Sequence, residues 1–123
     1  LIAYFDTLKY LAKGGRIGKA AGLVGSMLSV KPILTTREGE MAPLTRVRSL
    51  TAGLDYMYNF ATGYSKIEAM AVEHATTTVE ADKLVERIGA VYPRDKIVRS
   101  VISPVIGTYS GPGAIAVTVL EAK

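Results

Sequence analysis

The sequence opens on Leu1-Ile2-Ala3-Tyr4-Phe5-Asp6-Thr7-Leu8, and this stretch sets the order of the first elements. Its first five residues are apolar or aromatic and predict a strand. Asp6 is a good N-cap residue for a short helix expected over residues 7–13. Gly14-Gly15 can supply the left-handed stop of that helix. A first strand is therefore expected to feed directly into a helix.

A second helix is expected over residues 18–29. Its apolar residues have the i, i+3, i+4, i+7, i+8 spacing of one buried stripe: Ala20, Leu23, Val24, Met27 and Leu28. Another face carries almost no side chain, because it consists of Gly18, Gly22, Ser26 and Ser29. An interior helical glycine costs about 1 kcal/mol relative to alanine, so a neighbour close to this backbone is expected. That neighbour is either another helix or strand, or the alkyl chain of a ligand.

The rest of the chain alternates between strand and helix patterns. Glu38-Gly39-Glu40 separates two strands as in a β-hairpin, and Pro43 favours an edge position for the second of them. Thr77 and Glu80 have the spacing of a capping box at the start of the last helix. We expect six strands, over residues 1–5, 31–37, 41–47, 67–72, 97–102 and 114–120, and four helices, over 7–13, 18–29, 48–61 and 77–88. This alternation predicts an α/β fold with a mixed sheet, whose helices cover one face or both.

Composition narrows the class of protein. At 123 residues and 49% hydrophobic content, the chain has the size and apolar content of one globular domain. The longest apolar runs are far shorter than the roughly 18 residues of a membrane span, so none is expected. The sequence has no cysteine, which fits the cytoplasm. The net charge is +4, but the 15 Lys and Arg are dispersed, so no nucleic-acid partner is expected.

Four segments taken together resemble the C-terminal half of the DegV family of bacterial fatty-acid-binding proteins. They are Phe5-Asp6-Thr7-Leu8, Lys13-Gly14-Gly15-Arg16-Ile17-Gly18-Lys19-Ala20, Lys31-Pro32-Ile33-Leu34 and Pro104-Val105-Ile106-Gly107-Thr108-Tyr109-Ser110-Gly111-Pro112-Gly113. The resemblance covers about residues 2–121. It implies a two-layer α/β domain with a mixed six-stranded sheet and helices on one face. It also implies that residues 1–123 are the C-terminal domain of a longer protein, whose N-terminal domain is absent from this chain.

Arg16 is the first candidate site residue. It lies between the stop of one expected helix and the start of the next, where a guanidinium can bind a carboxylate or phosphate through two hydrogen bonds. An ordinary surface arginine is the alternative. The resemblance implies a role for Arg16 near the polar end of the ligand, or in docking a partner kinase.

The segment from Gly107 to Gly113 is the second candidate. Three glycines and a proline shape it as a defined loop that either exposes backbone amides or is only a tight turn. Similar DegV proteins usually carry a histidine at the position of Tyr109, and that histidine helps to hold the fatty-acid carboxylate. A phenol can donate a hydrogen bond but is uncharged near neutral pH. Thr108 and Ser110 are alternative hydroxyl donors.

Three apolar residues are candidates for the wall of a lipid tunnel, with core packing as the alternative for each: Leu23, Met27 and Ile33. His74 is the single histidine and has no second ligand residue grouped with it, so we expect a structural role for it. No catalytic arrangement, metal site or cofactor site is expected, because the sequence pattern presents neither a Ser-His-Asp set nor paired carboxylates.

The leading hypothesis is a lipid-binding module that is not an enzyme. The resemblance implies that, with its N-terminal domain, it encloses a long-chain fatty acid and presents the carboxylate to a fatty-acid kinase. One alternative is half of an enzyme that acts on a phosphorylated small molecule through the glycine-rich segments. The other is a protein-interaction domain whose exposed apolar face causes self-association.

Overall fold

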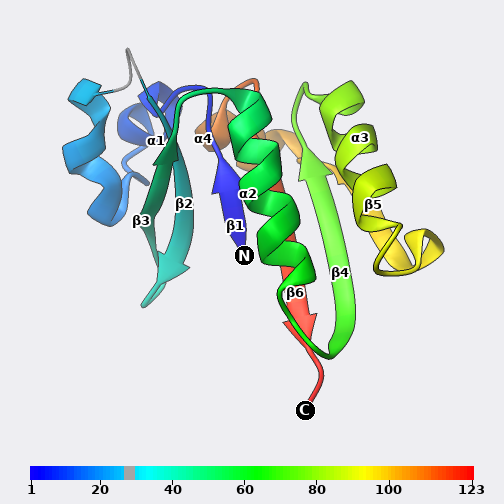
Figure 1. The fold of residues 1–123 in the computed structure, drawn as a ribbon. Coiled ribbons are helices and arrows are strands. Elements are labelled where there is room, and N and C mark those ends of the chain that lie inside the picture. Colours follow the sequence, from blue (N-terminus) through cyan, green and yellow to red (C-terminus); the bar gives the residue numbers. More distant parts are fainter. Residues whose placement is uncertain (27–29) are drawn as a thin grey trace.

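The computed structural model describes residues 1–26 and 30–123 (Figure 1). Within these residues the chain forms six strands: β1 (Ile2–Tyr4), β2 (Lys31–Arg37), β3 (Glu40–Val47), β4 (Ile67–His74), β5 (Ile97–Val101) and β6 (Ile115–Glu121). The α-helices in the described part are α1 (Lys9–Lys13), α2 (Leu50–Thr62), α3 (Thr78–Ile88) and α4 (Pro104–Ser110). Two further segments are 3-10 helices, η1 (Gly18–Ser26) and η2 (Arg94–Lys96).

All six strands of the described residues belong to one mixed sheet with the order β3-β2-β1-β6-β4-β5. Only the β4–β5 pair in it is parallel. The predicted mixed six-stranded α/β fold is confirmed. β3 is an edge strand, as Pro43 predicts, and a two-residue turn joins it to β2. Both turn residues, Glu38 and Gly39, have positive φ angles of 53° and 79°, as a type I′ hairpin requires.

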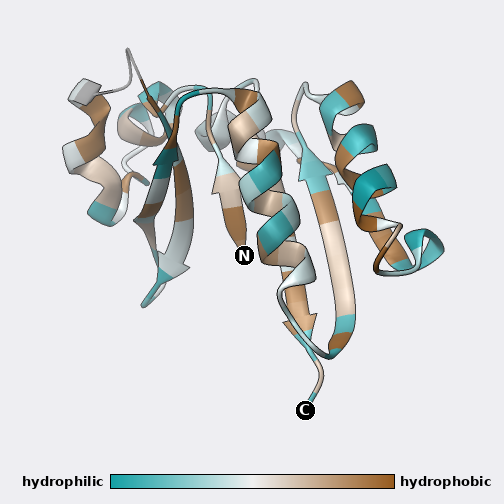
Figure 2. Ribbon diagram, viewed as in Figure 1, coloured by the Kyte–Doolittle hydropathy of each residue, from teal (hydrophilic) through white to brown (hydrophobic). Residues whose placement is uncertain are grey.

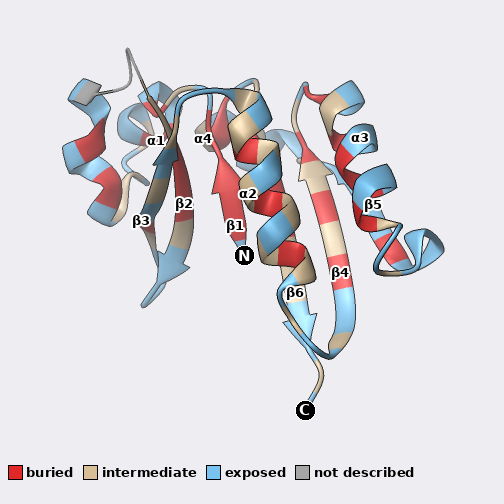
Figure 3. Cartoon of the chain, viewed as in Figure 1, coloured by how far each residue is buried: buried red, intermediate tan, exposed pale blue. Residues whose placement is uncertain are grey.

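The two long helices α2 and α3 lie on one face of the sheet (Figure 1). Their buried sides and the strands beneath form the larger core, which includes Ile2, Tyr4, Ile33, Met57, Val72, Leu84, Ile88 and Ile115 (Figure 3). In Figure 2 the same central strands are hydrophobic over most of their length. Gly53 allows α2 to approach β1 closely, since a Cβ there would lie 2.8 Å from the Tyr4 ring. The predicted two-layer arrangement is therefore present.

The short helical segments α1, η1 and α4 pack on the opposite face, near one end of the sheet (Figure 1). They bury a smaller apolar cluster that includes Ala3, Phe5, Leu8, Leu11, Ala20, Leu23, Leu34, Ala114 and Ala116. Among the described residues, no helix covers the remainder of this face. The two long helices thus lie on one face, as the resemblance implies, but the short helical segments cover part of the other face, so the helices are not confined to one face.

Two predicted helix starts are wrong in detail. The first helix begins at Lys9, whose amide donates to the Thr7 hydroxyl at 3.1 Å, while Asp6 forms an ion pair with Lys31. At α3 the Thr77 hydroxyl makes no capping bond and donates instead to the carbonyl of Ala114 at 3.1 Å. In both cases the side chain that local sequence assigns to the cap binds another residue instead, Lys31 of β2 or Ala114 just before β6.

The second predicted helix is a 3-10 helix over its described part. With three residues per turn, Ala20 and Leu23 are buried on one side, whereas Val24 is 42% exposed, contrary to the α-helical stripe. A Cβ at Gly18 would lie 2.9 Å from the Met41 carbonyl oxygen, so close packing of a strand explains this glycine. Nothing lies within 4 Å of a Cβ at Gly22. Residues 27–29, and with them Met27, lie outside the described residues.

The predicted loop that starts at Gly107 is wrong over its first part, because α4 continues to Ser110. Pro104 occupies the first turn, where a missing amide hydrogen costs nothing. The Gly107 amide donates to the Ser103 carbonyl at 2.7 Å, so it is used inside the helix. Only the segment from Gly111 to Gly113 turns, with positive φ angles of 75° and 81° at its two glycines.

Candidate functional site

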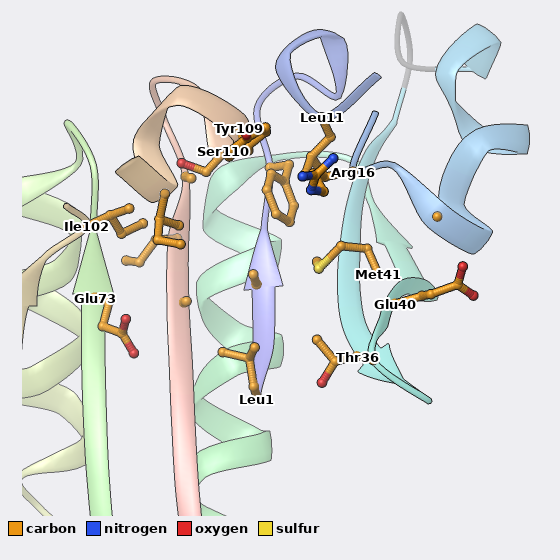
Figure 4. A pocket seen from close by; sticks show the side chains of 18 of the residues that line it. Leu1, Leu11, Arg16, Thr36, Glu40, Met41, Glu73, Ile102, Tyr109 and Ser110 are labelled. Atoms are coloured by element: carbon orange, nitrogen blue, oxygen red, sulfur yellow. The ribbon is translucent and has the colours of Figure 1, made fainter. Parts of the chain in front are cut away.

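An apolar pocket of about 560 Å³ lies on the partly covered face of the sheet (Figure 4). Its floor follows from the strand register, because residues paired across neighbouring strands point to the same face. Ala3 of β1 pairs with Ala116 of β6, and Ala116 also pairs with Glu73 of β4. Because the alanine side chains at the centre of the sheet are small, they leave space above the strands, and this space is the pocket. Larger side chains surround it, among them Leu1, Phe5, Leu11, Met41, Ile102 and Ile106.

Arg16, Tyr109 and Ser110 line the pocket near α1 and α4, and we call this part of the pocket its polar end (Figure 4). Arg16 is exposed, and its Nη1 donates to the Gly14 carbonyl at 3.2 Å. Its guanidinium carbon lies 5.4 Å from the centroid of the Tyr109 ring. Within the described residues Arg16 forms no ion pair. The cation is therefore available to an anionic ligand.

Ser110 adds a hydroxyl group at this end, and Tyr109 adds an aromatic ring. Ser110 is buried, and among the described residues its Oγ has only a long 3.4 Å hydrogen bond, to the neighbouring Gly111 carbonyl. Tyr109 is half-buried on α4. A guanidinium with a nearby hydroxyl suits a carboxylate, which accepts several hydrogen bonds.

Within the described residues, which exclude Met27, the other predicted site residues do not line this pocket. Thr108 is exposed, and its hydroxyl donates to the Pro104 carbonyl at 2.8 Å, while Gly107 lies inside the helix. Leu23 is buried in the smaller core near the pocket. Ile33 is fully buried on the other face, under α2, because its register partner Tyr4 also faces that way. Of the two alternatives for Ile33, core packing therefore applies, and this residue forms no wall of this pocket.

Glu73 is a lining residue that the sequence prediction missed. Its carboxylate accepts a hydrogen bond from the Thr118 hydroxyl at 3.2 Å, at the side of the pocket formed by β4 (Figure 4). A charged residue between two buried strand positions, Val72 and His74, was the available signal, because strand alternation places it on the opposite face. A carboxylate thus borders the alanine floor, and Thr36 and Glu40 are further polar residues of the lining.

His74 faces the α2–α3 layer and does not take part in the pocket. It is 5% exposed, and its Nδ1 has no hydrogen-bond partner within the described part of the chain. No group of three or more potential metal ligands occurs among residues 1–26 and 30–123. In the same residues no helix is both long and apolar enough to cross a membrane.

The sequence of this chain is similar to those of known proteins. A family model described as "Uncharacterised protein, DegV family" matches residues 1–122. A DegV domain-containing protein of Clostridium acetobutylicum is 36% identical over 121 residues, which cover 96% of this chain and 42% of that protein. Protein DegV of Bacillus subtilis is 36% identical over 120 residues, which cover 94% of this chain and 43% of that protein.

The fold of this chain is similar to the solved structures of DegV proteins. The crystal structure of DegV, a fatty acid binding protein from Bacillus subtilis, is 31% identical with a TM-score of 0.77, over 94% of this chain and 42% of that one. A fatty acid binding DegV family protein from Streptococcus agalactiae shares the fold, with a TM-score of 0.88 at 23% identity over 99% of this chain and 44% of that one. The chain spans less than half the length of these relatives. Since the family model matches almost every residue, from 1 to 122, the chain belongs to the DegV family.

Proposed function

We propose that this chain is the C-terminal domain of a cytoplasmic fatty-acid carrier, and that it is not itself an enzyme. The observation that supports this most is an apolar pocket with the Arg16 guanidinium at one end. This guanidinium forms no ion pair among the described residues. The Bacillus subtilis relative, at 31% identity, is a fatty acid binding protein. A long-chain fatty acid has the chemistry that matches this pocket, with an anionic head and an apolar tail.

Burial of the tail would provide most of the binding free energy. Each buried CH₂ contributes about 0.8 kcal/mol, so a long tail contributes on the order of 10 kcal/mol before the costs of binding. A volume of about 560 Å³ lies within the usual range for small-molecule sites. The tail would run over the alanine floor, between Phe5, Met41 and Ile106.

A second domain would complete the enclosure. The pocket is open on the side away from the sheet, and Val105 and Ile106 beside it are 73% and 57% exposed. An N-terminal domain that packs on this face would remove both the side chains and the ligand tail from water. The greater length of the relatives supports this arrangement.

The polar end would present the carboxylate to a fatty-acid kinase. Arg16 is exposed at the end of the sheet where α1 and α4 meet, so a bound headgroup there would lie near the molecular surface. Arg16 and Ser110 supply the polar groups of the headgroup site that we propose, and the ring of Tyr109 lies beside the Arg16 guanidinium. Phosphorylation itself would be the work of the partner.

Mass spectrometry of the extracted ligand tests the carrier function. The full-length protein is purified under native conditions, denatured and extracted, and the extract is analysed for small molecules. We expect one fatty acid per protein molecule. Absence of lipid, even after incubation with a panel of fatty acids, would overturn the proposal. Magnesium-dependent binding of a nucleotide or a phosphorylated sugar would favour the enzyme alternative instead.

A further inference from the structure

Helices α1 and α4 contact each other through two tyrosine rings, each of which packs on a glycine. The Tyr109 ring of α4 covers Gly14, which follows α1, so closely that a Cβ at Gly14 would overlap the ring. In return, the Tyr10 ring of α1 covers Gly111, which follows α4, and a Cβ there would also overlap the ring. We call these four residues the tyrosine–glycine clasp. It joins two segments that are far apart in the sequence.

The clasp also determines what lies next to Arg16. The Arg16 amide donates to the Leu11 carbonyl at 2.9 Å, which fixes the backbone just after α1. Its guanidinium then lies 5.4 Å from the Tyr109 ring centroid and donates to the Gly14 carbonyl. The side chain is otherwise exposed and has no ion pair among the described residues. In the part of the chain that the structure describes, the ring of Tyr109 and the backbone of Gly14 are therefore the two groups that restrain this guanidinium.

We propose that Tyr109 is a positioning residue for Arg16. Its ring, held in the clasp, restrains the guanidinium at the polar end of the pocket, so that less side-chain freedom is lost when a carboxylate binds. The aromatic face carries this role, because a cation above a ring is attracted by the negative charge of the π-system. The hydroxyl is not required. This inference rests on the proposed binding of a fatty acid.

The test separates the headgroup from the tail. The full-length protein is titrated with hexadecanoic acid and with hexadecan-1-ol, which share the alkyl chain and differ at the polar end. We expect Tyr109→Phe to bind both ligands as the parent does. Tyr109→Leu should bind the acid about two- to fivefold more weakly, as loss of an exposed cation–π contact predicts, and the alcohol unchanged. Gly14→Ala, which displaces the ring, should show the same selective loss.

A double variant tests the coupling. Because Tyr109 acts through Arg16, adding Tyr109→Leu to Arg16→Gln should cause no further loss of affinity for the acid. Tyr58→Leu is the matched control, since it removes the ring 4.3 Å from the Arg87 guanidinium and neither residue lines the pocket. It should leave the ratio of acid to alcohol affinity unchanged.

Three results would overturn the inference. Equal losses for acid and alcohol in Tyr109→Leu would show that the ring only packs. An equal loss for the acid in Tyr109→Phe and Tyr109→Leu would make the hydroxyl a direct ligand. Additive losses in the double variant would show that the two residues act independently. If the parent protein binds neither ligand, the proposed function itself fails, which is distinct from all three.

Discussion

Arg16 stands at the polar end of the pocket with its guanidinium exposed and 5.4 Å from the Tyr109 ring. A hydrogen bond to a charged group contributes about 1.5–3 kcal/mol. The Arg16→Gln variant is therefore expected to bind a long-chain fatty acid roughly 10- to 100-fold more weakly. Competition against a fluorescent acyl probe measures this change. Arg48→Gln removes the same charge from an exposed position outside the pocket, and an equal loss in that control would contradict a specific role for Arg16.

Glu73 places a charge beside the apolar floor. A tail that passes over this carboxylate removes water from it, and burying a charged group without enough partners is costly. Glu73→Gln keeps the shape and the contact with Thr118 but removes the charge. We expect tighter binding of long acyl chains by roughly fivefold, consistent with about 1 kcal/mol for one poorly solvated group. Equal affinity in the parent and the variant would show that the tail does not pass near β4.

Tyr4 links stability to alkaline pH. Burial, and to a smaller extent the Asp6 carboxylate, raises the pKa of the Tyr4 phenol above its usual value near 10. The folded state therefore holds this proton when the unfolded state has lost it, so the free energy of unfolding falls as pH rises above about 10. Urea unfolding of the parent and of Tyr4→Phe from pH 8 to 11 measures the effect. The variant should lose less stability over this range, and parallel curves would contradict the assignment to Tyr4.

Helix α2 approaches β1 through Gly53, and this contact decides how closely the two layers pack. A Cβ at Gly53 would lie 2.8 Å from the Tyr4 ring, whereas nothing lies within 4 Å of a Cβ at Gly22 in η1. Gly53→Ala should lower the free energy of unfolding by about 1–3 kcal/mol, as overpacking of a core does. Gly22→Ala is the control and should not destabilise the protein. Urea unfolding of both variants checks this, and equal stability would show that the layers can separate without cost.

Local sequence patterns predict most helices and strands, but they do not predict which side chains face the pocket. The hairpin, the edge position of β3 and the six strands follow from alternation and turn residues, which act over a few positions. Arg16 was found in the same way, from its place after a helix stop. For Ile33 the sequence leaves a tunnel wall and core packing open, since a buried strand position has no local mark that says which layer covers it. The contact between Tyr109 and Arg16 depends on the packing of α1 on α4, and no spacing in the sequence encodes that packing.

The sheet as a whole is covered unevenly, with α2 and α3 over one face and the pocket open on the other (Figure 1). Exposed apolar side chains, including Val98, Val105 and Ile106, lie on or beside the open face. Residues 1–123 alone should therefore self-associate, because a bare apolar surface of this kind favours contact between copies. Light scattering with and without fatty acid measures the association. Ile106→Lys should reduce it, and a monomer at high concentration would contradict the prediction.

The tyrosine–glycine clasp also restricts the order in which substitutions can accumulate. A side chain at Gly14 displaces the Tyr109 ring unless that ring has first been replaced by something smaller, and Gly111 depends on Tyr10 in the same way. Gly111 carries a second restriction, because its φ of 75° disfavours any side chain. The Gly14–Tyr109 pair is thus an epistatic unit with one favoured order of steps, whereas the φ angle of Gly111 disfavours a change there in either order. Laboratory evolution of this domain should change Tyr109 before Gly14, and should leave Gly111 unchanged.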